Sequence, residues 1–184
     1  MTSKKDNILK FPGLNSYTSN QSELFFSREK EVESILELLQ NNKLVTIASK
    51  SGAGKSSLIN AGIIPRLNSG LPAQAGRDWA ICKFRPGISP IENMCNSLTN
   101  KGAMYLNNKA KSTDFDEHMK DLKNKSALGL IDIYNNSEIS EKKNLLVIID
   151  QIEDLFLHNK FFDNESSDDD NLLIDIIYKS VKSK

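Results

Sequence analysis

The chain of 184 residues has few of the residues that build metal sites and disulfide frameworks. It contains only two cysteines, Cys82 and Cys95, and two histidines, His118 and His158. The cysteines form no C-x-x-C motif, so free thiols and a cytoplasmic location are the simplest interpretation. The histidines lie 40 residues apart with no ligand cluster around either one, and we therefore expect no structural zinc site.

Long apolar runs and an excess of charge of either sign are also missing. Lysine plus arginine number 24 and aspartate plus glutamate number 24, so the formal net charge is zero. This balance gives no electrostatic reason to expect nucleic acid or a membrane surface as a partner. No run approaches the roughly 18 apolar residues of a membrane span, and no apolar segment follows the basic N-terminus as it does in a signal peptide.

The most informative segment is residues 49–56, S-K-S-G-A-G-K-S, which ends in the Gly-Lys-Ser of a phosphate-binding loop. An apolar run precedes it and a helix-forming segment follows, which is the strand, loop and helix that this motif requires. Gly52 and Gly54 would let backbone N–H groups turn towards a phosphate, next to the positive end of the helix. Lys55 would reach the β- and γ-phosphates, and the Ser56 hydroxyl would ligate Mg²⁺. The predicted nucleotide-binding residues of the loop are Ser51, Gly52, Ala53, Gly54, Lys55, Ser56 and Ser57.

The loop departs from the usual G-x-x-x-x-G-K-[ST] pattern at its first position, where Ser49 replaces glycine. That glycine serves the turn that leaves the strand, so we expect Ser49 to tighten or strain the loop without removing a phosphate ligand. A serine-rich turn in front of an ordinary helix is the alternative interpretation of the segment.

A second motif is the run 145–150, L-L-V-I-I-D, in which five apolar residues end in a carboxylate. Apolar residues without alternation are typical of a strand buried on both faces of a parallel sheet. Asp150 then lies at the carboxyl tip, where ligands bind in open α/β sheets. This is a Walker B pattern, in which Asp150 would hold Mg²⁺ opposite Ser56. An ordinary core strand followed by a helix-capping aspartate is the alternative.

Hydrolysis needs a group that positions water and a cation that meets the charge of the transition state. Gln151 occupies the place where many P-loop ATPases carry glutamate, so Glu153 is our candidate base beside Lys55 in the catalytic set. Its alternative role is a glutamate placed for the helix macrodipole. None of the four arginines follows Arg85, which makes Arg85 the best candidate cation within the chain, with a surface arginine as the alternative. Arginine fingers from another molecule add on the order of 10³–10⁵ in rate, so we expect slow hydrolysis by this chain alone.

The remaining pattern predicts an α/β fold. Helices are expected over 28–40, 55–67, 90–98, 114–136 and 171–181, and strands over 44–48, 79–84 and 144–149. Strands that alternate with helices favour a doubly wound, mostly parallel sheet with helices on both faces. We expect a disordered N-terminus over 1–10, a lead-in with a helix over 11–43, and a P-loop NTPase core over 44–184. Only three strands are convincing, so this core looks incomplete at its C-terminal end.

Several phrases together resemble one family. They are F-P-G-L-N-S-Y-T at 11–18, L-F-F-S-R-E-K-E at 24–31, S-G-A-G-K-S-S-L-I-N-A-G-I-I-P-R-L at 51–67, W-A-I-C-K-F-R-P-G-I-S-P at 79–90 and L-L-V-I-I-D-Q-I-E-D-L-F at 145–156. In order and spacing they are similar to the novel STAND NTPase 1 domain, a bacterial branch of the signal-transduction ATPases. The resemblance covers about residues 11–157.

The resemblance implies a Mg²⁺-dependent switch in signalling or defence, closed with ADP at rest and oligomeric with ATP when triggered. It places the F-F-S-R-E segment near the adenine, which adds Arg28 to the nucleotide-binding candidates, although Ser27 replaces the family glycine there. Sensor or effector modules would lie outside this chain, and a fragment or truncated reading frame is the preferred account. A guanine-specific N-K-x-D motif is missing, which favours ATP and ADP. The alternatives are a non-catalytic interaction module that binds nucleotide poorly and a small-molecule P-loop kinase.

Overall fold

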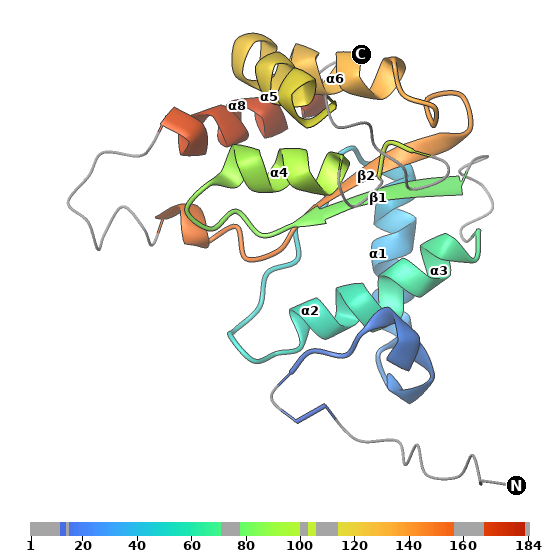
Figure 1. Cartoon of the computed structure of the whole chain (residues 1–184). Helices are drawn as coiled ribbons and strands as arrows, with labels where there is room; N and C mark the ends of the chain where they lie inside the picture. The colour runs from blue at the N-terminus through green and yellow to red at the C-terminus, as the bar shows by residue number, and fades with distance from the viewer. Residues whose placement is uncertain are drawn as a thin grey trace, which may run out of the picture. The chain divides into compact units, whose positions relative to one another are not determined.

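A computed structural model of the chain describes residues 12–13, 15–70, 78–99, 103–105, 114–156 and 168–182. The chain divides into two compact units, Met1–Gly76 and Arg77–Lys184 (Figure 1). The first unit contains the predicted phosphate loop, and the second contains the sheet and Asp150. Across the described ranges, no helix combines the length and the apolar character that crossing a bilayer requires.

Helices form the regular structure of the first unit. A 3-10 helix, η1 (Ser19–Leu24), precedes α1 (Glu29–Asn41). After a loop, a helical rod follows, which confirms the helix predicted over 55–67. The rod is made of α2 (Lys55–Ser57), the π-helical segment η2 (Leu58–Ile63) and α3 (Ile64–Asn68). The wide π turn ends next to Pro65, whose ring removes the N–H that a regular α-helical ladder would use.

Gly62 explains how closely the elements of the first unit pack. A Cβ atom at this position would lie 2.6 Å from Val32 Cγ2 of α1 and 3.3 Å from Phe25 Cε1. Real Cβ atoms do not approach other atoms to 2.6 Å, so only glycine allows α1 to rest this near the rod. The apolar side chains buried in this unit are Val32, Leu36, Leu58, Ile59, Ala61, Ile63 and Leu67.

The start of α1 differs from the prediction. The sequence favours a helix over 28–40, and the observed helix begins and ends one residue later. The N-cap position is taken by Arg28, because Ser27 has a φ of 67°, in the left-handed region. This conformation explains why the family pattern has glycine at the position of Ser27.

The strand predicted over 44–48 is absent, and this part of the prediction is wrong. Among the described residues the sheet has two strands, and neither comes from this segment. A strand is stable only when a neighbour satisfies its N–H and C=O groups, and the described part of the first unit contains no strand to pair with. Leu44 accordingly remains 55 % exposed. The structure thus supports an α/β fold with a small parallel sheet, and the wider doubly wound sheet stays a prediction.

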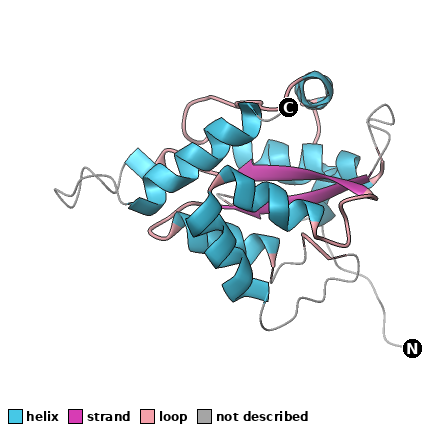
Figure 2. Cartoon of the chain, turned by 90° about the horizontal axis from the view of Figure 1, so that it is seen from above, coloured by secondary structure: helices cyan, strands magenta, loops and turns pink. Residues whose placement is uncertain are grey.

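The two strands of the second unit confirm the predictions over 79–84 and 144–149. β1 (Asp78–Phe84) and β2 (Lys143–Ile149) are parallel and pair residue by residue from Asp78 with Lys143 to Phe84 with Ile149. Figure 2 shows the two strands side by side. β2 is half-buried along its whole length, whereas the sequence predicts burial on both faces. The reason is that β2 pairs with β1 alone in the described sheet, and its alternate residues face the helical core.

α4 (Pro90–Leu98) confirms its prediction and forms the layer next to the strands. Ile91, Met94, Cys95 and Leu98 form its buried stripe, and each is at most 1 % exposed. β1 places Ala80, Cys82 and Phe84 in the same hydrophobic cluster. α4 therefore fixes the sheet whose carboxyl end carries the polar residues discussed below.

Three further helices complete the core of the second unit beyond α4 (Figure 1). The helix predicted over 114–136 is two helices, α5 (Asp114–Lys125) and α6 (Ala127–Asn135). The chain breaks at Ser126, whose φ is 53°. α8 (Asp168–Lys182) begins three residues before the predicted helix, and its first turn carries three aspartates that suit the positive helix end. Residues 157–167, which precede α8, lie outside the described residues.

Candidate functional site

The backbone of the predicted phosphate loop turns where the sequence has glycine. Gly52 has a φ of 78° and Gly54 a φ of 81°, both in the left-handed region that glycine adopts without strain. Gly54 is also the N-cap of the helical rod, and its carbonyl accepts a hydrogen bond from the Leu58 amide over 2.8 Å. Ser49, where the family has glycine, is not in the left-handed region, so its backbone carries no strain of that kind.

Lys55 folds back over its own loop. Its Nζ donates to the carbonyl oxygens of Ser49, over 3.0 Å, and Lys50, over 3.4 Å. Neutral carbonyl oxygens are weaker partners for an ammonium group than anionic oxygens. This arrangement therefore holds a cation at the mouth of the loop and lets an anionic ligand replace the carbonyls.

Two serines, Ser56 and Ser57, directly follow Lys55. Both Ser56 and Ser57 are half-buried in the first turn of the rod. The Ser57 hydroxyl oxygen accepts a hydrogen bond from the Tyr17 amide over 3.1 Å, so it ties the lead-in segment to the loop. This contact gives Ser57 a structural role at the position where the sequence predicts a nucleotide contact.

Arg28 connects the F-F-S-R-E segment to the loop. One guanidinium nitrogen donates to the Ala53 carbonyl oxygen over 3.2 Å, and Nε forms an ion pair with Glu31 over 2.6 Å. Arg28 also lines a cavity of about 350 Å³ together with Ser49 and Lys55. The structure thus brings Arg28 and the loop together around one cavity, and nucleotide contact by Arg28 stays a prediction.

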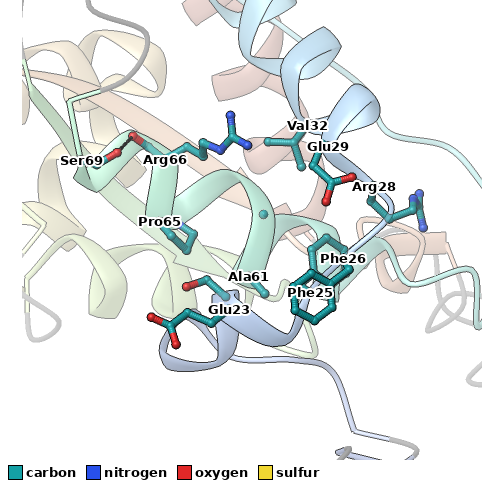
Figure 3. Close-up of a pocket in the computed structure, with 12 residues that line it drawn as sticks. Glu23, Phe25, Phe26, Arg28, Glu29, Val32, Ala61, Pro65, Arg66 and Ser69 are labelled. Atoms are coloured by element: carbon teal, nitrogen blue, oxygen red, sulfur yellow. Dashed lines mark hydrogen bonds between the residues drawn. The ribbon is translucent and has the colours of Figure 1, made fainter.

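Arg28 lines a second cavity of about 400 Å³ that has an apolar wall. Figure 3 shows Phe25 and Phe26 beside Arg28 at one end, and Arg66 at the other. Phe26 is 69 % exposed, which is unusual for a large aromatic side chain without a partner to cover it. Aromatic faces and guanidinium groups are the side chains on which planar rings stack.

Asp150 lies at the carboxyl end of β2 as predicted. Its amide donates to the Phe84 carbonyl oxygen over 2.9 Å, which extends the ladder between the strands. Its carboxylate forms an ion pair with Lys83, whose Nζ lies 3.4 Å from Oδ2. The sequence analysis missed Lys83, although a lysine at the end of an apolar strand was a visible signal. Because Ser56 and Asp150 belong to different units, the metal pair stays a prediction.

Arg85, the candidate transition-state cation, is bound to a carboxylate that the sequence analysis did not single out. Its Nε donates to Asp154 Oδ2 over 2.5 Å, and its NH2 donates to Oδ1 over 3.1 Å. Asp154 is only 6 % exposed, whereas the Arg85 side chain is 61 % exposed. The hydrogen bond to Asp154, with smaller contributions from the charges of Asp150 and Glu153, raises the pKa of Arg85 against the opposing effect of desolvation.

The turn between Asp150 and Asp154 is strained. Gln151 has a φ of 61°, and its side-chain Oε1 is buried with no hydrogen-bond partner. A non-glycine residue in the left-handed region costs about 1–2 kcal/mol. Glu153, the candidate base, is exposed on this turn. Strain of this kind persists only where surrounding contacts determine the backbone conformation.

The side chains present suit a hard cation that is shared with a ligand. Within the ranges that the structure describes, no group of three or more histidine, cysteine, aspartate or glutamate side chains is placed to hold a metal ion. Magnesium at phosphate sites is typically held by one or two carboxylates with ligand oxygens and water, and not by an all-protein cage. Ser56 supplies a hydroxyl and Asp150 a carboxylate, each of this chemical type, and a metal site that they share remains a prediction because they belong to different units.

Comparison with protein families matches residues 11–183 to the family described as Novel STAND NTPase 1. Searches of curated proteins and of solved structures returned no match. The family match includes the predicted phosphate loop, the F-F-S-R-E segment and both strands. The chain therefore belongs to the Novel STAND NTPase 1 family, as its sequence phrases indicate.

Proposed function

We propose that the chain is an ATP-binding switch domain that depends on Mg²⁺ and hydrolyses ATP slowly. The observation that carries this proposal is the loop over 49–56, where two left-handed glycines turn the backbone and the Lys55 ammonium lies over the loop carbonyls. Membership of an NTPase family supports nucleotide binding. The missing N-K-x-D motif supports adenine over guanine.

In this proposal phosphate oxygens replace the carbonyl oxygens of Ser49 and Lys50 as hydrogen-bond acceptors of Lys55 Nζ. The loop amides and the positive end of the helical rod stabilise the same negative charge. Ser56 and Asp150 would hold Mg²⁺, which would neutralise charge on the phosphate oxygens. Glu153 orients the attacking water from its exposed place on the turn.

The two cavities beside Arg28 support a place for the nucleoside. One cavity is lined by Ser49 and Lys55 of the loop, so it borders the proposed phosphate site. The other cavity, lined by Phe25 and Phe26, offers aromatic faces to a flat base. The arginine contacts the loop through Ala53 and lines both cavities, so it is suited to connect phosphate binding with base binding. We propose that nucleotide state controls assembly of the protein into oligomers and with effector or sensor modules.

The experiment that tests nucleotide binding is a fluorescence titration with mant-ATP and Mg²⁺. Removing a hydrogen bond to a charged group costs about 1.5–3 kcal/mol, so Lys55→Ala should bind about 10- to 100-fold more weakly than wild type. Lys43→Ala removes a charge of the same sign outside the loop and should bind as wild type does. Equal binding by wild type and Lys55→Ala would remove the chemical basis of the proposal and favour a non-catalytic interaction module.

Competition and product analysis define the reaction. Unlabelled ATP and ADP should displace mant-ATP at concentrations at which GTP does not. Phosphate release should be slow and should fall further in Glu153→Gln. Transfer of phosphate to an added small-molecule acceptor, in place of release to water, would identify a kinase and contradict the switch.

A further inference from the structure

Arg85 and Asp154 connect the carboxyl ends of the two strands. Arg85 directly follows β1, and Asp154 lies five residues beyond the end of β2. Both hydrogen bonds of the pair are charge-assisted and come from two nitrogens of one guanidinium group, which fixes the relative orientation of the two side chains. The pair therefore fixes the position of the segment after β2 relative to the end of β1.

The turn that carries Asp150, Gln151 and Glu153 is held at both ends. At its start, the Asp150 amide is bound to the Phe84 carbonyl oxygen. At its end, Asp154 is held by Arg85, and Leu155 is buried in the hydrophobic core. Between these points the Asp154 amide donates to the Gln151 carbonyl oxygen over 3.0 Å, which closes the turn.

The strain at Gln151 shows that contacts outside the turn impose its shape. A left-handed backbone and a buried, unpartnered Oε1 both raise the energy of this conformation. Three backbone hydrogen bonds close the segment after Gln151, from the amides of Asp154, Leu155 and Phe156 to the carbonyl oxygens of Gln151, Ile152 and Glu153. The side-chain pair adds the constraint that holds this segment against the end of β1. Loss of the pair would let Gln151 relax and move its neighbours Asp150 and Glu153.

We propose that Arg85 is a positioning residue that acts through Asp154 to hold Asp150 and Glu153 in place, and that it does not meet the phosphate charge itself. A direct contact with phosphate through Nε or NH2, the two nitrogens that bind Asp154, would require them to leave that carboxylate. That would strand a buried carboxylate without its cation, which is strongly unfavourable. The roles of Asp150 and Glu153 in this inference rest on the proposed function, whereas the contact between Arg85 and Asp154 is observed directly.

The test is a cycle of Arg85→Gln, Asp154→Asn and the double variant, with Arg85→Lys as the conservative replacement. For each variant, turnover and KM for ATP are measured. Hydrogen exchange of the backbone amides of 150–156 is measured separately, in nucleotide-free protein. Lys179→Gln is the matched control, because it removes an exposed ion pair with Asp175 in α8. Where turnover is too slow to follow, the Mg²⁺ concentration that gives half-maximal mant-ATP binding reports the placement of Asp150.

Positioning predicts that Arg85→Gln and Asp154→Asn each lower kcat by about tenfold or more with little change in KM, because small misplacement of a reacting group costs up to about 10²-fold. The double variant should lose no more than the worse single variant, Arg85→Lys should recover part of the loss, and amides of 150–156 should exchange faster in each variant. The Mg²⁺ midpoint should rise in the same variants. Lys179→Gln should match wild type.

Three results would overturn the inference. Wild-type turnover in Asp154→Asn with a loss in Arg85→Gln would mean that Arg85 acts directly. Losses that multiply in the double variant would mean that the two residues act independently. Lower melting temperatures with unchanged turnover, Mg²⁺ midpoint and exchange would mean a purely structural pair. If Arg85→Gln does not fold, Asp154→Asn and the double variant still decide. Absence of Lys55-dependent mant-ATP binding in wild type is a different result, since it rejects the proposed function.

Discussion

Arg28 donates a hydrogen bond to the carbonyl oxygen of Ala53 and so joins the start of α1 to the middle of the phosphate loop. The two residues are 25 positions apart in the sequence, and Arg28 also lines a cavity together with Ser49 and Lys55 of the loop. This contact makes the loop conformation depend on a side chain from a different segment.

Replacing Arg28 with alanine should therefore weaken nucleotide binding. Loss of one hydrogen bond is worth about 0.5–1.5 kcal/mol, which corresponds to about two- to tenfold in the Kd for mant-ATP. Glu31→Gln is the matched control, because it weakens the ion pair of Arg28 and leaves the contact with Ala53. An unchanged Kd in Arg28→Ala, or an equal loss in Glu31→Gln, would contradict this prediction.

Replacing Ser27 with glycine should stabilise the protein. Ser27 has a φ of 67°, and relief of the left-handed strain should raise the free energy of unfolding by about 1 kcal/mol. The amide of residue 27 keeps its hydrogen bond to Glu29 in the variant, because only the side chain changes. Ser34→Gly, in the interior of α1, should instead lower the stability by about 0.5 kcal/mol. Urea unfolding of both variants measures the difference, and a loss of stability in Ser27→Gly would reject the strain argument.

Replacing Gly62 with alanine should destabilise the first unit. The added Cβ would meet Val32 Cγ2 at 2.6 Å, and overpacking of this kind costs about 1–3 kcal/mol. Val32→Ala removes the group that clashes, so the double variant should lose less stability than the sum of the two single variants. Additive losses in thermal unfolding would show that Gly62 does not contact Val32 in this way.

The free energy of unfolding should fall as the pH is lowered from 7.5 to 5.5, because His118 becomes protonated more readily in the unfolded chain than in the folded protein. Burial lowers the pKa of His118 below its usual value, against the opposing charges of Asp114, Asp121 and Glu117. The unfolded chain therefore binds a proton at a higher pH than the folded protein does, so stability rises with pH in this window. His118→Gln should flatten the dependence, measured as urea unfolding at both pH values. A slope unchanged by the substitution would assign the effect to another group.

Local patterns predicted the helices and strands in which the spacing of apolar residues along the sequence already indicates the secondary structure. The stripe of Ile91, Met94, Cys95 and Leu98 identified α4, and the apolar run before Asp150 identified β2. The turns at Gly52 and Gly54 were predictable because a short segment sets this backbone shape by itself and glycine adopts it without strain. In each case the information lies within about ten neighbouring residues.

Other features depend on contacts between distant segments and could not be read in this way. The pair of Arg85 and Asp154 joins residues 69 positions apart. Gly129 lets α6 approach α5, where a Cβ would lie 2.1 Å from the Asp121 carbonyl oxygen. Ser126 gave no local signal for the break between these helices, and its hydroxyl donates to Asp175 of α8.

Lys83 and Arg85 are two residues apart, so their side chains leave the chain in the same direction, and each meets a carboxylate that follows β2. If β1 slipped by a single residue against β2, both cations would turn away together and Phe84 would face the two carboxylates. Both ion pairs therefore favour the observed alignment of the strands, and a misaligned sheet would lose both of them at the end that carries Asp150 and Asp154.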